Sequence, residues 1–434
     1  MGTSRKKVAI IGAGWAGCAA AVEAIRLGHH ATVFEAARAI GGRARRLDIA
    51  LNGKTIALDN GQHILIGAYS ETLKLMAELG VDITQALHRM PLTLLSPDGS
   101  GLKLPNLPAP FDALVGILRA QGWSWVDKFS LLKTATLWQL QQFKCDPALS
   151  VADLCSKVTP RIMATLIEPL CVSALNTPAD RASGQVFLRV LKDSLFSVSG
   201  GSNLLLPRTD LSALLPDAAL AWLTKQGGQI HLGCRVSSIT PQQGNTWQLT
   251  GAANAPLGQF DSVILACPPN EAARLARRTA LPCTNWLTLA DGLQYEAIAT
   301  VYAHAPGTRL AQPMLALPSS STRPAQFVFD RGQLGGPPGL LAFVVSASQQ
   351  GSGEIAEQVT TQAAQQLGLK NMQVLQTVVE KRATFACTPG LQRPSAQLVT
   401  GLLACGDYVD GPYPATLEGA VRSGLEAAGL VGRL

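Results

Sequence analysis

The chain has 434 residues, 47% of them hydrophobic and 15% charged, which suffices for two or three globular domains with a sizeable core. It contains no run of eighteen uncharged apolar residues, no CxxC pair among its nine cysteines and no basic helix interleaved with aromatic residues. We therefore expect a cytoplasmic protein with reduced thiols, without metal or nucleic acid, whose net charge of +7 serves an anionic ligand or anionic lipid.

A glycine-rich motif lies near the start of the chain. Residues 8–11 form an apolar run typical of a buried parallel strand, a helix is predicted over 18–27, and GAGWAG lies between them. The first glycine permits a tight turn, the second lets the backbone approach a pyrophosphate, and the third lets the helix pack close to the sheet. The phosphates would lie at the helix N-terminus. The predicted cofactor contacts in this motif are Gly12, Gly14, Trp15, Ala16 and Gly17.

An acidic residue ends the second predicted strand, which spans 31–34. Glu35 comes eighteen residues after Gly17, where its carboxylate can accept hydrogen bonds from both hydroxyls of an adenosine ribose, and Ala36 beside it is a further predicted contact. Strand, glycine motif, helix, strand and acid in this order predict a βαβ dinucleotide site. The alternative is a glycine-rich turn in another kind of α/β protein.

The doublet Gly41-Gly42, followed by Arg43, indicates which of the two common dinucleotide cofactors, NAD or FAD, the site binds. The segment GGRAR resembles the GG doublet with paired arginines of FAD-dependent amine oxidases and carotenoid-type desaturases. In those families the doublet and its arginine lie against the flavin diphosphate, and Gly42 and Arg43 are the matching positions. The resemblance therefore implies FAD as the cofactor.

A hairpin is predicted over 47–58, with its turn at Asn52-Gly53, and it leads into DNGQH at 59–63. Together with the following ILIGAY and a predicted helix over 71–79, this motif resembles the hydroxysqualene dehydroxylases. They are squalene-associated FAD-dependent enzymes of bacterial hopanoid synthesis, related to phytoene desaturases. The resemblance covers nearly the whole chain. It implies an α/β fold with a Rossmann-type, glutathione-reductase-like FAD-binding domain and an inserted substrate domain of mixed sheet plus helical cap.

The order of the motifs predicts two discontinuous domains. Residues 1–90, 196–270 and 395–434 are assigned to the FAD-binding domain, and residues 91–195 and 271–394 to the substrate domain with its helical cap.

Helical periodicity follows a proline-rich break. Ser124 and Asp127 form a predicted N-cap for one of these helices. The predicted helices span 111–120, 124–143, 151–154 and 160–170.

Three of the seven tryptophans, Trp123, Trp125 and Trp138, fall in this helical stretch. They belong either to the core of the cap or to an interfacial face that touches membrane. The resemblance implies a long isoprenoid substrate, which is poorly soluble in water. We therefore expect a peripheral protein at the inner face of the cytoplasmic membrane.

Strand-like runs dominate the second half of the chain. In the flavoproteins that the chain resembles, the strand near Val236 brings backbone to the adenine, so Val236 is a candidate adenine contact. The predicted strands span 229–239, 247–250, 261–267, 285–303 and 325–347.

A second glycine motif, GSGEIA at 351–356, fits the GxGxxA pattern, with Glu380 at about the distance of a ribose acid. Glu354 would place a negative charge against a pyrophosphate, and Ser352 is well suited to cap a helix. We expect an ordinary helix start here and no separate NAD(P)H domain.

The last motif combines Gly406-Asp407 after an apolar strand with a helix predicted from about Ala415. In the FAD superfamily that the chain resembles, this signature pairs with the N-terminal glycine motif. The resemblance implies that Asp407 binds the ribityl or diphosphate region. It also implies that the helix N-terminus, at Ala415 and Thr416, points at the flavin and stabilises its anionic reduced form.

The candidate catalytic residues come from DNGQH and its neighbourhood. Gly61 is a predicted FAD contact, His63 or Gln62 beside it is expected to meet the departing hydroxyl, and Tyr69 is the reserve candidate. An imidazole can donate a proton near neutral pH and so help a hydroxyl to leave as water. The alternative is that His63 only hydrogen-bonds the backbone where the chain turns.

The resemblance implies reductive removal of the hydroxyl of hydroxysqualene to give squalene. Two other readings stay open: a carotenoid or phytoene desaturase or amine oxidase, and a prenyl-binding protein without redox activity of the GDP-dissociation-inhibitor type. Glu35 and Asp407, both expected to bind FAD, argue against the last.

Overall fold

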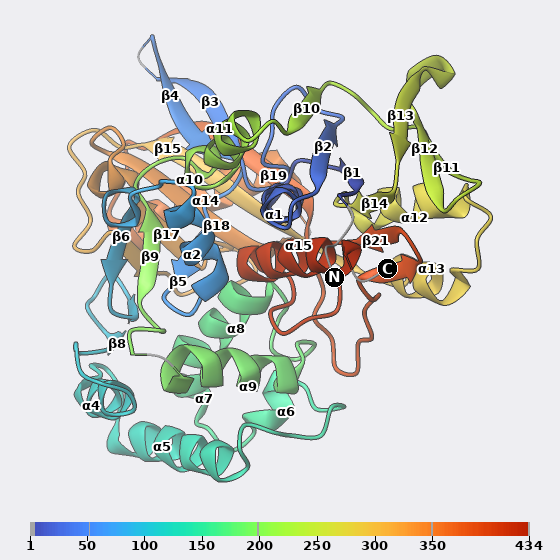
Figure 1. The fold of residues 1–434 in the computed structure, drawn as a ribbon. Coiled ribbons are helices and arrows are strands. Elements are labelled where there is room, and N and C mark those ends of the chain that lie inside the picture. The colour runs from blue at the N-terminus through green and yellow to red at the C-terminus, as the bar shows by residue number, and fades with distance from the viewer. Residues whose placement is uncertain (1–4, 52, 198, 349, 433–434) are drawn as a thin grey trace.

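A six-stranded sheet joins the two ends of the chain in the computed structural model, which describes residues 5–51, 53–197, 199–348 and 350–432 (Figure 1). Five of its strands run parallel, and β20 pairs antiparallel with β21. The α/β fold class and the strands predicted over 8–11 and 31–34 are confirmed. The spatial order is β10 (Gln229–Leu232), β2 (His30–Glu35), β1 (Lys7–Ile11), β14 (Ser262–Leu265), β21 (Leu402–Ala404) and β20 (Gln397–Val399).

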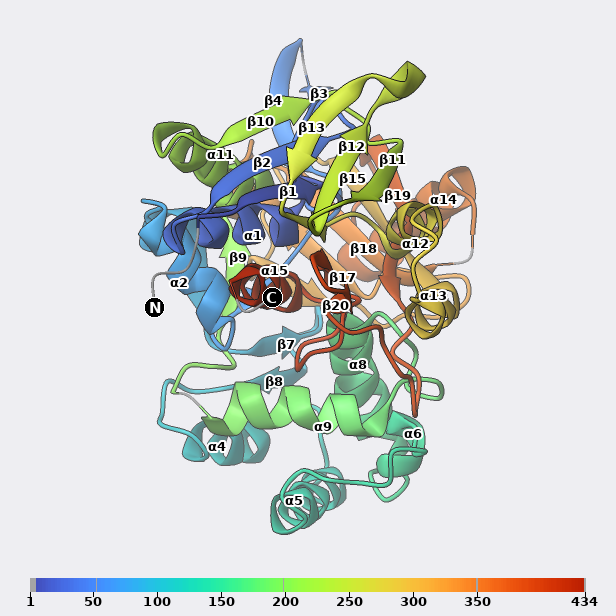
Figure 2. The same cartoon turned by 45° about the vertical axis from the view of Figure 1, so that its right-hand side comes forward.

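Both faces of this sheet are buried. Along β1, Val8 and Ile10 pack into one hydrophobic cluster, while Ala9 and Ile11 pack into another on the opposite face. The first face is covered by α1 (Trp15–Arg26) and α15 (Leu417–Val431), as Figure 2 shows. The other face bears a three-stranded sheet of β11 (Ser238–Gln242), β12 (Thr246–Thr250) and β13 (Pro256–Phe260).

A five-stranded antiparallel sheet lies beside the first, with α14 (Ser352–Leu367) packed on it. The helix start predicted at GSGEIA is confirmed. The predicted Ser352 cap is wrong, because Ser352 is already the first helical residue and Gly351 is the N-cap, with no side-chain hydrogen bond. The sheet order is β16 (Met314–Ala316), β17 (Phe327–Asp330), β18 (Leu340–Ser348), β15 (Tyr295–His304) and β19 (Gln373–Phe385).

A helical layer occupies the end of the molecule away from β10 and α11 (Figures 1 and 2). The predicted N-cap is confirmed as a full capping box, in which Ser124 and Asp127 hydrogen-bond each other's backbone amides. The helix predicted over 160–170 is interrupted by a π-helical turn at Met163–Ile167 and extends five residues further. The helices are α4 (Phe111–Arg119), α5 (Trp125–Leu140), α6 (Val151–Leu154), α7 (Pro160–Ile162), α8 (Glu168–Leu175) and α9 (Gly184–Lys192).

Short elements connect these layers. Asn52 of the predicted hairpin turn lies outside the described residues, although its two strands pair as predicted. The predicted domain boundaries stay a prediction. The connecting elements are β3 (Arg46–Leu51), β4 (Lys54–Asp59), β5 (Leu65–Ile66), α2 (Ser70–Glu78), α3 (Ile83–Ala86), β6 (Leu87–Met90), β7 (Thr93–Leu95), β8 (Gly101–Lys103), β9 (Leu204–Pro207), α10 (Leu211–Leu214), α11 (Pro216–Lys225), α12 (Pro269–Arg277) and α13 (Thr284–Asp291).

Three strand predictions are wrong in extent. The run 229–239 is two strands in different sheets, because Gly233 takes φ +66° and turns the chain after β10. The run 285–303 begins as α13, whose Trp286 and Ala290 are buried at helical spacing. The run 325–347 is broken by a 3-10 turn between β17 and β18. Sequence reasoning also missed β13.

The contact between α1 and α15 generates a stability prediction. A Cβ on Gly424 would lie 2.2 Å from Ala16 O, whereas one on Gly429, in the same helix, would meet nothing within 4 Å. Gly424→Ala should therefore lower the free energy of unfolding by about 1–3 kcal/mol through overpacking. Gly429→Ala should raise it by about 0.5–1 kcal/mol through helix propensity. Urea unfolding of both variants checks this, and equal effects would contradict the packing argument.

Candidate functional site

A cavity of about 560 Å³ lies at the carboxyl ends of the parallel strands. Gly12 and Gly14 follow β1, Glu35 ends β2, Cys267 follows β14 and Asp407 follows β21, and all five residues line the cavity. Open α/β sheets bind their ligands at this edge. The volume is typical of a small-molecule site.

Close backbone packing explains the glycine motif. A Cβ on Gly12, where φ is +114°, would lie 2.5 Å from Ala266 O, and one on Gly17 would lie 2.0 Å from Gly12 O. Gly17 does not line the cavity, so it acts by letting α1 pack against the turn. The other predicted contacts of the motif, Gly12, Gly14, Trp15 and Ala16, do line the cavity.

Hydrogen bonds attach the loop of the GG doublet to this motif. Gly41 N donates to Ala13 O at 2.8 Å, and Trp15 Nε1 donates to Ala44 O at 2.9 Å. Gly42 has φ +61°, and a Cβ on it would lie 3.3 Å from the Cα of Gly14. The two glycines therefore face each other as bare backbone, a surface that a diphosphate can approach closely.

The Glu35 carboxylate is held in place by backbone amides. Its Oε2 accepts a hydrogen bond from Ala13 N at 2.8 Å, and its Oε1 accepts one from Ala37 N at 2.7 Å. A carboxylate can accept about four hydrogen bonds, so positions remain for two ribose hydroxyls. Ala36 and Val236 line the same cavity, and Cys234 N donating to Glu35 O brings the Val236 segment there.

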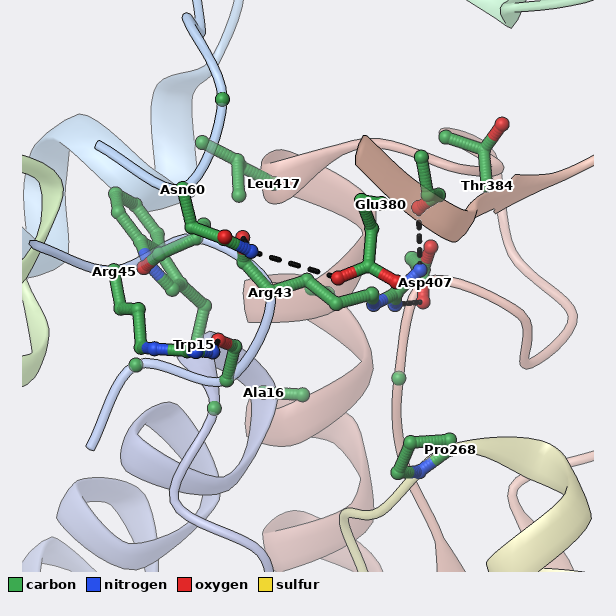
Figure 3. A pocket seen from close by; sticks show the side chains of 18 of the residues that line it. Trp15, Ala16, Arg43, Arg45, Asn60, Pro268, Glu380, Thr384, Asp407 and Leu417 are labelled. Atoms are coloured by element: carbon green, nitrogen blue, oxygen red, sulfur yellow. Dashed lines mark hydrogen bonds and ion pairs between the residues drawn. The ribbon is translucent and has the colours of Figure 1, made fainter. Parts of the chain in front are cut away.

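An ion pair joins the GG doublet to the C-terminal motif. Arg43 pairs with Asp407, and its other terminal nitrogen donates to Ala383 O at 2.6 Å (Figure 3). Glu380 lies beside Arg43 and accepts a weak hydrogen bond from Asn60 at 3.5 Å. Sequence reasoning named Glu380 only as part of the rejected second motif, because nothing local distinguishes it along β19.

The N-terminus of α15 meets the same cavity. Thr416 is its N-cap and accepts a hydrogen bond from Gly419 N at 2.9 Å, so the helix begins at Leu417, two residues later than predicted. Ala415, Thr416, Leu417 and Ala420 line the cavity. The positive end of the helix dipole therefore faces this cavity.

Two buried polar atoms of the cavity have no hydrogen-bond partner, Gln62 Oε1 and Tyr408 OH. An unpaired buried polar group costs about 1–3 kcal/mol, which favours a ligand that pairs with it. Together with the facing glycines Gly14 and Gly42, the Glu35 carboxylate and the α15 N-terminus, Tyr408 OH fits a dinucleotide that carries a polar ring system. This set of polar groups therefore fits FAD.

The candidate catalytic residues all line the cavity. His63 Nδ1 lies 2.9 Å from Gly61 O; since a carbonyl only accepts, Nδ1 carries a hydrogen and Nε2 is the position that gains or loses a proton. Burial lowers the pKa of His63, and Arg43 lowers it further. Burial raises the pKa of Tyr69, which therefore stays protonated.

A further part of the lining comes from α8 and the five-stranded sheet and is largely apolar. Sequence reasoning assigned these segments to a substrate domain without naming residues, since the apolar positions of a strand do not reveal which face lines a cavity. The residues are Val172, Ala174, Ile298, Phe327, Phe329 and Val344.

Within the described residues, no cluster of three or more His, Cys, Asp or Glu side chains is arranged to hold a metal ion. No helix there has the length and apolar character needed to cross a bilayer.

Removal of either predicted acid should weaken flavin binding. Glu35→Ala and Asp407→Ala each delete a charge-assisted hydrogen bond worth about 1.5–3 kcal/mol, so each should purify with less flavin per chain. The ratio of flavin to protein absorbance measures this. Glu354→Ala, in the second glycine motif, is the matched control and should keep full flavin content. Full flavin content in both test variants would refute the nucleotide-site assignment.

Comparisons with known proteins agree with this geometry. Residues 15–432 match the family described as flavin containing amine oxidoreductase. A hydroxysqualene dehydroxylase of Rhodopseudomonas palustris is 28% identical, over 98% of each chain. A zeta-carotene desaturase of Arabidopsis thaliana is 24% identical, over 60% of this chain and 50% of its own.

The fold also matches solved structures. An oxidoreductase of Methanosarcina mazei superposes with a TM-score of 0.72 at 19% identity, over 97% of this chain and 99% of its own. At that identity the likeness concerns the fold alone. The family match begins at residue 15, inside the glycine motif, and covers the GG doublet and the C-terminal signature. Residues of all three line one cavity. The chain therefore belongs to the flavin containing amine oxidoreductase family and is an FAD-dependent oxidoreductase.

Proposed function

We propose that the protein reductively removes the hydroxyl of hydroxysqualene to give squalene. The observation that carries this proposal is a single cavity in which the FAD-binding groups and a largely apolar lining from α8 and the five-stranded sheet adjoin. A long isoprenoid fits an apolar lining because burial of each methylene contributes about 0.8 kcal/mol. The nearly full-length similarity to hydroxysqualene dehydroxylases supports the same substrate.

The reaction needs a hydride and a proton, and water leaves. Bound FAD, in its reduced form, supplies the hydride. The chain's own contribution is to bind and orient the isoprenoid, to exclude water and to hold a proton for the departing hydroxyl. His63 Nε2 is the proposed proton donor. The neighbouring Gln62 Oε1, which has no partner, would accept a hydrogen bond from the same hydroxyl.

The proposed setting follows from the substrate. We propose a role in hopanoid biosynthesis and a location at the inner face of the cytoplasmic membrane, because the substrate resides in lipid. A carotenoid-type desaturase would use the same cofactor and a similar apolar lining, with hydride moving from substrate to flavin. The direction of hydride transfer and the identity of the substrate therefore distinguish a dehydroxylase from a desaturase.

An anaerobic assay tests the proposal. The purified protein, reduced with dithionite and mixed with detergent-dispersed hydroxysqualene, should form squalene with stoichiometric reoxidation of the flavin. In the matched reaction, the protein with its flavin oxidised is mixed with phytoene. Desaturation of phytoene without conversion of hydroxysqualene would replace the proposal with the desaturase reading, and a protein that binds isoprenoid but no flavin would favour the prenyl-binding reading.

The role of His63 has its own test. His63→Gln should keep its flavin but lose about 10²–10⁴-fold in turnover of the alcohol, the usual contribution of general acid catalysis. Since burial lowers the pKa of His63, the active imidazolium should accumulate only below about pH 6.5. Wild-type turnover should therefore rise as the pH falls through that range, and the variant should lose this dependence.

His88→Gln is the matched control for this measurement. Arg208 and burial also lower the pKa of His88, but His88 lies outside the cavity, so its variant should keep both the rate and the pH profile of the wild type. Wild-type turnover in His63→Gln would remove His63 from the mechanism.

A further inference from the structure

Exposed apolar side chains gather on two neighbouring helices. Of the eleven large hydrophobic side chains that are exposed among the described residues, nine lie between positions 107 and 140, on or just before α4 and α5. Monomeric soluble proteins rarely expose a contiguous apolar patch of this kind without a use for it. We define the α4–α5 face by these nine residues: Leu107, Phe111, Leu114, Leu118, Trp125, Val126, Phe129, Leu137 and Leu140.

The spacing gives each helix one outward apolar stripe. On α4 the stripe recurs at 111, 114 and 118, and on α5 at 126, 129, 137 and 140. The opposite side of each helix already packs inward, through residues such as Ile117 on α4 and Leu131 on α5. The exposed stripes are therefore not needed to hold the helices to the protein.

Specific contacts join the two stripes. The helices touch each other, and Lys128 Nζ donates to Leu118 O at 2.8 Å while lying 5.1 Å from the ring centre of Trp125. The rings of Trp125 and Phe129 are 6.0 Å apart. Trp125 and Phe129 thus lie side by side, and Lys128 links them to the end of α4.

The three tryptophans of this region divide between core and surface. Trp123 and Trp138 are buried, with 7% and 5% of their surface exposed, whereas Trp125 is 62% exposed. Trp123 Nε1 donates to Thr165 Oγ1 at 3.1 Å, which fixes it inside the helical layer. Trp125 alone of the three can therefore meet an external partner.

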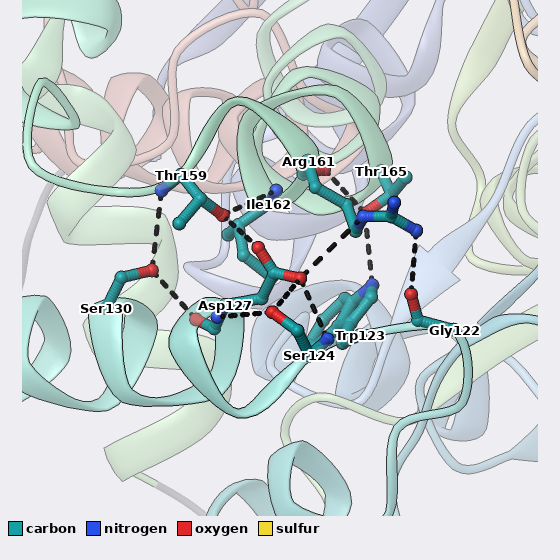
Figure 4. A network of polar contacts seen from close by, with 9 residues as sticks. All are labelled: Gly122, Trp123, Ser124, Asp127, Ser130, Thr159, Arg161, Ile162 and Thr165. Carbon is teal, nitrogen blue, oxygen red and sulfur yellow. Dashed lines mark hydrogen bonds and ion pairs between the residues drawn. The ribbon is translucent and has the colours of Figure 1, made fainter.

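Basic residues predominate among the exposed charges beside this surface. Asp112 and Asp127, the acids of α4 and α5, are buried. Asp127 accepts hydrogen bonds from Ser124 and Thr159 and pairs with Arg161 at 3.7 Å (Figure 4). The exposed charges on the two helices are the basic residues Arg119 and Lys133, and the loop after α5 exposes Lys144 and the acid Asp146.

We propose that the α4–α5 face docks on an anionic phospholipid membrane. Amphipathic helices with Trp, Phe and Leu on the apolar side and Lys or Arg beside them bind in the interface of such bilayers. Positive charge around the apolar stripes complements lipid phosphates, and this complementarity favours lipid over a second copy of the chain, whose face would carry the same charge. Delivery of an isoprenoid through this face rests on the proposed function, but docking itself does not.

Vesicle co-sedimentation of the holoprotein tests the docking. Vesicles of phosphatidylcholine with one quarter phosphatidylglycerol should bind the wild type at least about tenfold more tightly than pure phosphatidylcholine vesicles. Phe129→Ser/Leu140→Ser should weaken binding to the anionic vesicles by at least about tenfold. The matched control, Leu27→Ser/Leu232→Ser, removes two exposed leucines elsewhere and should bind as the wild type does.

A charge series separates local attraction from net charge. Arg119→Gln/Lys133→Gln/Lys144→Gln should weaken binding at least about tenfold, whereas Lys54→Gln/Lys74→Gln/Lys225→Gln, with the same net charge, should not. Trp125 fluorescence should shift to shorter wavelength on binding, and Trp125→Phe should bind but lose most of the shift. Equal binding by both charge variants, or a tryptophan shift that survives in Trp125→Phe, would overturn the proposal.

Two outcomes distinguish this inference from the proposed function. If the protein converts detergent-dispersed hydroxysqualene but ignores anionic vesicles, the docking inference falls and the proposed function stands. Face-dependent vesicle binding without conversion of hydroxysqualene would leave docking intact and refute the function.

If sedimentation velocity finds a dimer that Phe129→Ser/Leu140→Ser converts to monomer, and vesicles do not bind, the face is an interface between copies and the proposal is overturned.

Discussion

The close packing of α1 against α15 is the constraint on which the cofactor site depends. Gly424 of α15 lies against the backbone of Ala16, near the start of α1, and leaves no room for a Cβ. Both helices begin at the cavity, so this contact brings their two N-termini to the same ligand. Each N-terminus carries partial positive charge, and a diphosphate is the kind of group they bind. Segments from the two ends of the chain thereby make one site.

Features of the site that depend on local stereochemistry could be predicted from the sequence. Gly12 takes φ +114°, which favours glycine, and Gly17 is a glycine because Gly12 O lies 2.0 Å from where its Cβ would be. Glu35 ends a short strand whose neighbour carries the glycine motif, so its place at the carboxyl edge follows from parallel pairing. Thr416 caps its own helix by accepting a hydrogen bond from Gly419 N, three residues later in the chain. Such signals are readable without knowledge of distant contacts.

Features set by distant partners could not be predicted. The turn after β10 brings Cys234 N to Glu35 O, a contact between segments about 200 residues apart. Glu380 lies beside Arg43 and Asn60 because the fold brings β19 next to the GG doublet. The sequence around Glu380 is that of an ordinary strand and does not mark it as a site residue. Trp123 and Trp125 are two residues apart, yet one is buried and the other exposed. In each case the tertiary neighbour decides the role, not the local pattern.

The helical layer links the two ends of the proposed substrate path. α5 contacts α7, which continues through the π-helical turn into α8, and α8 supplies apolar residues to the cavity. An isoprenoid of about thirty carbons would need roughly 20 kcal/mol of gross transfer free energy to leave an apolar phase for water. A protein that released such a molecule into solution between membrane and flavin would be limited by that step. With a docking face and a cavity wall on one layer, the substrate can keep apolar contact throughout, which is the physical reason for joining a polar cofactor site to an apolar cap.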